Sequence, residues 1–266
     1  MRDCIIHSHR KEVRLHIPEK SGLAFRNTAT AGKEAGTLLI TGPPGSGKTR
    51  LACELARALV GEGETFLIDW PEEGGTRTVE DMAIPFVTLK VQKEVDELLS
   101  LLKSTIKPLA LVNDSLPAMY ECFMRMHAPT GVPPEDHGKT WRAVELDFKG
   151  QVSNFKLVPS VKWYMATSLI WPDEDDITGV RRLLMTVPGK LKGNAYGLFD
   201  YVINLVLLDG AGGKVLRVAE LQPTSRTVAK VRMPPSAKVV AKVSYDLADE
   251  RGVKPLLEAL RLEGKG

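Results

Sequence analysis

The sequence predicts an α/β protein with a mostly parallel sheet that carries helices on both faces. Short apolar runs alternate with segments of helical periodicity between residues 37 and 168. This alternation is typical of parallel sheets, because parallel neighbours need a crossover connection that is usually a helix. After residue 200, apolar runs follow one another across short glycine-rich turns, and this pattern predicts antiparallel hairpins.

The elements follow in order along the chain. Short apolar runs bounded by turn residues predict buried strands at Thr37–Thr41, Thr65–Asp69, Pro85–Leu89, Leu109–Val112 and Val161–Ser168. Apolar residues at helical spacing predict helices at Lys48–Val60, Val91–Lys103, Leu116–His127 and Trp141–Phe155. We expect an acidic loop at Trp171–Gly179, hairpin strands at Tyr201–Leu208, Lys214–Glu220 and Thr227–Met233, and a final helix at Val253–Leu262.

Composition excludes several classes of protein. Of the 266 residues, 43% are hydrophobic and 26% charged, as in ordinary globular proteins. The apolar stretches are far shorter than the roughly 20 residues of a membrane helix, and residues 1–11 lack the apolar region of a signal peptide. The 3 cysteines are too few for a disulfide framework. We therefore expect a cytoplasmic protein with no membrane partner.

The distribution of charge and the pattern of apolar residues divide the chain into three expected parts. These are a basic N-terminal extension over residues 1–35, a core over 36–235, and an appended C-terminal segment over 236–266. The net charge is +3, but residues 177–235 hold nine Lys and Arg against three Asp and Glu. Such a basic region is either a surface that meets phosphates or an ordinary solvated face, and the charge alone does not separate the two.

A phosphate-binding loop follows the first buried strand. It consists of Gly42, Pro43, Pro44, Gly45, Ser46, Gly47, Lys48 and Thr49, and Arg50 comes directly after it. The spacing matches G-x-x-x-x-G-K-[ST], in which backbone N–H groups surround the β-phosphate at the start of a helix. Lys48 is expected to reach the β- and γ-phosphates, and the Thr49 hydroxyl to coordinate Mg²⁺. The loop therefore predicts ATP and Mg²⁺ as cofactors.

A second acidic group is needed on the magnesium side of such a loop. Asp114 lies at the C-terminal end of the strand expected at Leu109–Val112, at the edge of the sheet where α/β proteins bind ligands. We expect Asp114 to be this carboxylate, with Asn113 as the local alternative for a polar contact. Hydrolysis also needs a group that activates water. Glu72 and Glu73 both follow another buried strand, and the sequence leaves three alternatives open: that Glu72, Glu73 or neither is this base. Asp69 at the end of that strand is expected either to join the site or to cap the turn.

These segments together resemble the RecA-like P-loop ATPases, and specifically a family of phage-encoded NTP-binding proteins that includes single-strand annealing ATPases. The resemblance extends over residues 36–235. It is carried by the phosphate loop, by FLIDWPEEGG at residues 66–75, by LALVNDS at 109–115, and by VKWYMATSL at 161–169. In the C-terminal part, Pro-Gly-Lys, Phe-Asp-Tyr-Val and Ala-Lys-x-Arg follow one another, and this succession narrows the resemblance from RecA-like ATPases in general to the phage-encoded family. The resemblance implies a RecA-like core with a mostly parallel sheet and C-terminal antiparallel hairpin strands.

The resemblance also implies roles for individual residues. Thr167 or Ser168 would sense the γ-phosphate, and Lys230 and Arg232 would reach a neighbouring subunit's nucleotide across an interface. The segment Leu169–Lys190 would contact single-stranded DNA, with Arg181, Arg182, Lys190 and Lys192 as the DNA-binding residues. Against this interpretation, four consecutive acids at residues 173–176 would repel a phosphate backbone. Lys230 and Arg232 also fit an exposed strand whose alternate residues share one face.

The expected function is therefore that of a DNA-recombination ATPase. It would bind single-stranded DNA, promote annealing or pairing, and hydrolyse ATP at subunit interfaces of a ring or filament, with DNA stimulating turnover. A single-strand binding protein is a further expected partner, and the location would be the host cytoplasm. The alternative is a nucleotide-switched loader or partner-binding ATPase that does not depend on DNA.

Overall fold

The chain forms two compact units, Met1–Ala35 and Gly36–Gly266. The computed structural model describes residues 2–8, 11–17, 35–61, 65–71, 73–128, 131, 137–174, 181–210, 215–232, 238, 240–246 and 252–262. In the first unit, β1 (Arg2–Ser8) and β2 (Lys11–Ile17) pair as an antiparallel hairpin. The sequence pattern does not predict this hairpin, because its apolar and polar residues do not alternate cleanly.

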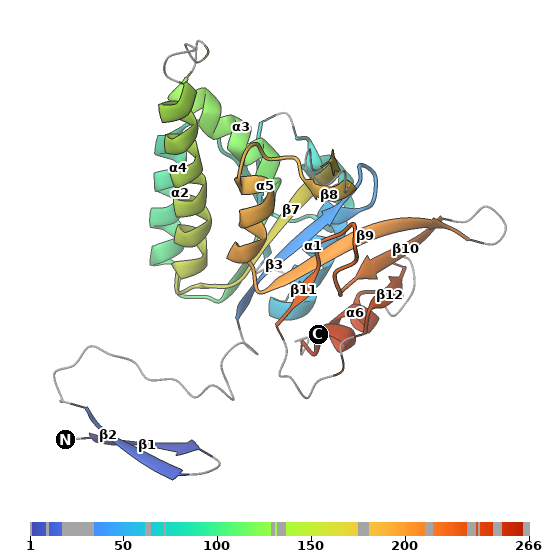
Figure 1. Ribbon diagram of the computed structural model, residues 1–266. Coiled ribbons are helices and arrows are strands. Elements are labelled where there is room, and N and C mark those ends of the chain that lie inside the picture. Colours follow the sequence, from blue (N-terminus) through green and yellow to red (C-terminus); the bar gives the residue numbers. More distant parts are fainter. Residues whose placement is uncertain are drawn as a thin grey trace. The chain divides into compact units, whose positions relative to one another are not determined.

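The second unit is built on one sheet, whose path within the described residues is β12-β10-β9-β3-β7-β6-β4-β5. The pairs among β9, β3, β7, β6, β4 and β5 are parallel, whereas β10 and β12 add antiparallel strands at one side (Figure 1). This confirms the predicted fold class. The strands on this path are β3 (Gly36–Gly42), β4 (Thr65–Asp69), β5 (Phe86–Thr88), β6 (Leu109–Asp114), β7 (Val161–Glu174), β9 (Tyr201–Asp209), β10 (Val215–Glu220) and β12 (Lys242–Tyr245).

Helices cover both faces of this sheet and enclose one apolar core on each. The core on one face contains α1 (Lys48–Val60) and α6 (Lys254–Leu260). The core on the other face contains α2 (Gln92–Ser104), α3 (Leu116–His127) and α4 (His137–Leu157). Among the described residues, the short helices are η2 (Gly75–Met82), α5 (Leu191–Asn194) and η4 (Ala195–Leu198). Among the described residues, no helix is both long and apolar enough to cross a bilayer.

Several boundaries differ from those expected. The expected acidic loop begins as strand, because β7 continues to Glu174 and pairs with β8 (Arg181–Met185). The strand expected at Thr227–Met233 shortens to β11 (Lys230–Val231), which pairs with β9. The C-terminal segment contributes β12 to the sheet and the leucines of α6 to the core beside α1. These contacts depend on pairing between distant segments, which local patterns do not encode.

The carboxyl ends of the parallel strands meet at one edge of the sheet. Thr41 pairs with Ser168, and Asp69 pairs with Asp114. The connections that leave this edge include the phosphate loop after β3, the segment after β4, the start of α3 after β6, and the extension of β7. Polar residues that follow different strands are thus brought within reach of one another.

Candidate nucleotide site

The phosphate loop connects buried β3 to α1, as its spacing predicts. Helix α1 begins at Lys48, and Gly47 precedes it with a φ of 86°, a left-handed conformation that favours glycine. The hydroxyl of Ser46 is buried and has no hydrogen-bond partner among the described residues. The loop therefore presents backbone N–H groups and the positive end of a helix to an anion.

Lys48 lies over this loop. Its Nζ donates a hydrogen bond to the carbonyl oxygen of Pro43 at 2.9 Å. Burial lowers the pKa of Lys48, while the negative charges of Asp114 and Glu73 oppose that effect. A bound phosphate would offer this lysine a stronger, charge-assisted partner than a carbonyl oxygen.

Asp114 is the centre of the polar contacts at this edge. The residue is 1% exposed. Its Oδ2 accepts a hydrogen bond from the Thr49 hydroxyl at 2.9 Å, and its Oδ1 accepts one from the Thr167 hydroxyl. Burial raises the pKa of Asp114 to about 6; the two hydroxyls lower it, and the charges of Glu73 and Asp69 raise it further. The sequence-predicted pair of Thr49 and Asp114 is thus in direct contact.

The donors present here fit a magnesium ion. Thr49 and Asp114 supply hydroxyl and carboxylate oxygens, the ligands that Mg²⁺ prefers, and a bound cation would compensate the buried negative charge. Within the described residues, no His, Cys, Asp and Glu side chains form a group that could hold a metal ion alone. When bound, such an ion neutralises charge that develops on the phosphate oxygens.

Glu73 and Asp69 approach the same edge from the segment after β4. The Ser115 hydroxyl donates a hydrogen bond to Glu73 Oε2 at 2.9 Å, which keeps this carboxylate beside the end of β6. Burial raises the pKa of Asp69, the charge of Glu73 adds to that rise, and the backbone N–H of Gly75 opposes it. Asp69 therefore contacts the backbone of the turn that follows β4, in agreement with the expectation that it caps this turn. Glu72, the other candidate base, lies outside the described residues.

Gly75 is a residue whose importance sequence reasoning missed. A Cβ atom on Gly75 would overlap Asp114 Oδ2. Only glycine therefore allows the start of η2 to pass so close to the buried carboxylate. The available signal was the Gly74-Gly75 pair directly after the acidic run.

The structure separates several residues that the sequence left as alternatives. Asn113 turns away from the phosphate loop, since its amide contacts Trp70 Nε1 at 2.5 Å and the Tyr164 hydroxyl at 2.7 Å. Thr167 contacts Asp114, whereas the hydroxyl of Ser168 donates to the carbonyl of Leu169. Of these two residues, Thr167 is therefore better placed for the expected contact with the γ-phosphate, because its hydroxyl lies at Asp114.

Arg50 does not point to the phosphate loop. Its guanidinium forms two hydrogen bonds with the carboxylate of Asp81, at 2.9 and 2.8 Å. This contact raises the pKa of Arg50 and lowers that of Asp81. The side chain of Arg50 is therefore held on the surface of α1 beside η2, so only its backbone N–H remains available to a phosphate.

Lys230 and Arg232 lie at the opposite end of the sheet from the phosphate loop. Val231 pairs with Tyr201, and Tyr201 pairs with Leu38, four residues before Gly42. At ~3.3 Å per residue, Val231 is about 13 Å from the loop along the strand direction. Lys230 pairs with Val202, and Val202 with Leu39, so the backbone of Lys230 is about 10 Å from the loop in that direction.

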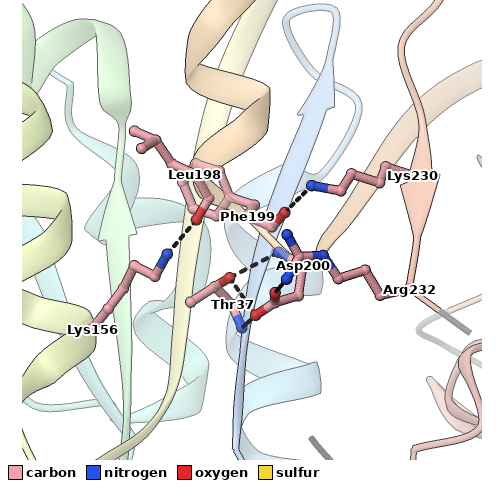
Figure 2. Close-up of polar contacts among 7 residues, drawn as sticks. All are labelled: Thr37, Lys156, Leu198, Phe199, Asp200, Lys230 and Arg232. Atoms are coloured by element: carbon pink, nitrogen blue, oxygen red, sulfur yellow. Dashed lines mark hydrogen bonds and ion pairs between the residues drawn. The ribbon is translucent and has the colours of Figure 1, made fainter.

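Both side chains contact the turn that leads into β9 (Figure 2). Lys230 Nζ donates to the carbonyl of Phe199 at 2.6 Å, and Arg232 Nη1 donates to Asp200 Oδ1 at 2.8 Å. Asp200 also accepts hydrogen bonds from the backbone N–H and the hydroxyl of Thr37. Lys156 donates to the neighbouring carbonyl of Leu198. Three basic side chains thus gather around one short turn and the carboxylate of Asp200.

The expected DNA-binding residues lie on or near the β7–β8 hairpin. Arg181 Nε pairs with Glu174 at 2.6 Å, and Lys192 Nζ pairs with Asp173 at 2.7 Å. Acids that were expected to oppose DNA binding therefore neutralise two of the four basic residues. Arg182 and Lys190 have no ion pair within the part of the chain that the structure describes. Residues 175–180, which include two of the four consecutive acids, lie outside that part.

A phosphate loop at the start of a helix, with a buried carboxylate on its magnesium side, defines a P-loop ATPase. The profile of the AAA domain family matches residues 35–233, and the chain belongs to this family. Comparison with curated proteins gives no match.

Solved structures with a related arrangement share little sequence with this chain. The RadB recombinase is 19% identical, with 82% of this chain and 89% of that chain covered and a TM-score of 0.46. The flagellar accessory protein FlaH from Methanocaldococcus jannaschii is 11% identical, with 80% and 85% covered and a TM-score of 0.43. A prototypical ATPase from the type III secretion system of pathogenic bacteria is 14% identical, with a TM-score of 0.45. Its alignment covers 65% of this chain and only 52% of that chain, so this chain spans about half of its length.

Proposed function

We propose that this P-loop ATPase is a RecA-like DNA-recombination enzyme that binds single-stranded DNA and promotes annealing or pairing. Hydrolysis would take place at subunit interfaces of a ring or filament, with ATP and Mg²⁺ bound at Lys48, Thr49 and Asp114. The observation that carries the proposal is the position of Lys230 and Arg232, at the end of the sheet away from the subunit's own phosphate loop.

The positions of Lys230 and Arg232 support a contact with the nucleotide of a neighbouring subunit, that is, a role in trans. Both side chains start at least about 10 Å from the loop along the strand and are directed to the turn before β9, so neither meets its own subunit's γ-phosphate. Arg232 is exposed on the surface, and its partner Asp200 also accepts two hydrogen bonds from Thr37. Asp200 therefore keeps hydrogen-bond partners when Arg232 leaves it. A neighbour's triphosphate is a stronger partner for Arg232 than one carboxylate at the surface. Hydrolysis would then depend on assembly, because the cation that stabilises the transition state comes from another subunit.

The β7–β8 hairpin supports the DNA-binding part of the proposal. Trp171 on β7 is 66% exposed, whereas Trp163 on the same strand is 2% exposed and belongs to the core. An exposed aromatic ring on the same hairpin as Arg182 offers a stacking surface for a base near a charge for a phosphate. The hairpin also leaves the edge of the sheet where β7 passes Thr167, so DNA bound there could influence the nucleotide site.

One observation favours the alternative of a nucleotide-switched loader that does not need DNA. Asp173 and Glu174 already neutralise Lys192 and Arg181, so the hairpin carries less free positive charge than its sequence suggests. In that case, the nucleotide state would change a protein contact instead of a DNA contact.

The first test is the steady-state ATPase rate with and without single-stranded DNA at two salt concentrations. The recombination proposal expects a DNA-dependent rise that weakens as salt increases. Trp171→Ala should reduce the apparent DNA affinity about tenfold, within the range for loss of one base-stacking side chain. Trp141→Ala, which removes another exposed tryptophan on α4, is the matched control. A rate that DNA does not change at either salt concentration would leave the loader as the better-supported function.

The second test mixes inactive subunits. Lys48→Ala removes the nucleotide site, and Arg232→Ala removes the proposed trans cation. If the cation acts across an interface, a mixture of the two variants contains some interfaces with both groups intact and regains activity. A mixture no more active than the two variants measured separately would contradict the trans role.

A further inference from the structure

The phosphate loop has a basic neighbour, Arg217, that has no role in the proposed hydrolysis or DNA binding. Arg217, on β10, is half-buried, and its Nε lies 3.5 Å from the position that a Cβ atom on Gly47 would occupy. A side chain at position 47 would therefore be in van der Waals contact with Arg217, which places this arginine beside the residue that precedes α1. The structure gives Arg217 no hydrogen bond or ion pair within the residues it describes.

The orientation of the site defines which end of a nucleotide would meet Arg217. The groups for the γ-phosphate and magnesium, Asp114 and Thr167, come from β6 and β7, on one side of β3. Arg217 comes from β10, on the other side of β3, where β9 and β10 lie (Figure 1). A nucleotide whose β-phosphate lies in the loop and whose γ-phosphate points toward β7 must extend its nucleoside toward β10.

The surroundings of Arg217 suit a planar, hydrophobic ligand group. Leu207 and Tyr245 are its register partners on the two neighbouring strands, so their side chains share its face of the sheet. Tyr245 is 6% exposed, and its hydroxyl has no hydrogen-bond partner among the described residues. A guanidinium is itself planar and weakly hydrated, and it stacks on aromatic faces.

We propose that Arg217 contacts the nucleoside of the bound nucleotide in the same subunit, with its guanidinium stacked on the base. This inference rests on the proposed nucleotide site, but it does not depend on DNA binding or on the trans cations. It separates the basic residues of the C-terminal part by role: Arg217 acts in cis on the nucleoside, and Arg232 in trans on the phosphates.

The test compares two ligands that share their phosphates and differ in the nucleoside. Binding of ATP and of inorganic tripolyphosphate, both with Mg²⁺, is measured by calorimetry for the unaltered protein and for Arg217→Ala. We expect ATP affinity to fall about tenfold, as for other side chains that stack on a base, and tripolyphosphate affinity to stay unchanged. Arg217→Lys keeps the charge but loses the planar group, so it should resemble Arg217→Ala for ATP.

Controls separate failure of this inference from failure of the nucleotide site. Arg142→Ala removes an exposed arginine of α4, on the opposite face of the sheet, and should change neither affinity. Lys48→Ala should weaken both ligands; if it weakens neither, the nucleotide site itself is wrongly assigned. Provided that Lys48→Ala behaves as expected, two results would overturn the role of Arg217. One is an equal loss for both ligands, which would indicate a phosphate contact, and the other is no loss for either.

Discussion

Replacing Asp114 by asparagine is expected to stabilise the nucleotide-free protein at neutral pH while it abolishes ATP hydrolysis. The carboxylate is 1% exposed, and burial is the main reason that its pKa rises from 3.8 to about 6. An ionised group in such a place favours the unfolded chain, where water solvates the charge. The same charge is needed once a magnesium ion and a nucleotide are present.

The magnitude follows from the change in pKa. A rise from 3.8 to about 6 corresponds to roughly 3 kcal/mol of lost stability when the group is ionised in both states. Asparagine keeps the shape but turns one acceptor into a donor, so the hydroxyl of Thr49 or Thr167 must reorient. That change costs about 1 kcal/mol. The expected net gain for Asp114→Asn is therefore about 2 kcal/mol in the free energy of unfolding.

The pH dependence has a defined sign. The unfolded chain releases this proton near pH 4 and the folded protein near pH 6, so the folded state binds more protons between these values. Stability contributed by the protonated group is thus lost as pH rises from about 4 to about 6, and it stays lost above that range. Asp114→Asn should therefore be stabilising at about pH 8 and have little effect at about pH 4.

The assay is urea unfolding at both pH values with a chelator and without nucleotide. Asp81→Asn is the matched control, because that carboxylate is exposed and Arg50 lowers its pKa; this variant should not be stabilising. An Asp114→Asn protein that is less stable than the unaltered protein at the higher pH, or whose difference does not change with pH, would refute the reasoning.

Three further outcomes are expected. Gly75→Ala should reduce ATP turnover, because the new Cβ would clash with the Asp114 carboxylate, whereas Gly138→Ala, which meets no atom within 4 Å, should leave turnover unchanged; equal rates in the two variants would contradict the close approach. Asn113→Ala should cost about 3 kcal/mol in urea unfolding, since it leaves buried polar groups of two aromatic partners unpaired; a loss below about 1 kcal/mol would count against that network. Glu73→Gln should lower kcat about 100-fold with little change in KM if Glu73 activates water, and an unchanged kcat would leave Glu72 as the candidate.

The sequence predicted the phosphate loop and its flanking elements with accurate boundaries. The expected and observed bounds coincide for α1, for β4 and for α3. These elements are encoded locally: an apolar run, a glycine-rich turn and an amphipathic helix follow one another within about 20 residues. The position of Asp114 was also predictable, because the carboxyl ends of parallel strands meet at one edge.

Contacts between distant segments were decided only by the tertiary structure. The sequence placed Arg50 with the phosphate loop, but η2 supplies Asp81 and draws its side chain away. It could not choose between Thr167 and Ser168, because that choice depends on which residue of β7 faces Asp114 on β6. The hairpin β1–β2 and the strand β12 had no clear local pattern.

The sequence by itself therefore determines the phosphate-binding chemistry of this protein. The positions of the other residues around the phosphate loop are determined only by the tertiary structure. A G-x-x-x-x-G-K-T loop binds phosphate wherever a strand and a helix hold it, because its own backbone makes the site. The positions of Gly75, Arg217 and Arg232 relative to that loop depend on strand order and register across the whole sheet. Register depends on the packing of side chains from segments far apart in the chain, so only the folded structure fixes it.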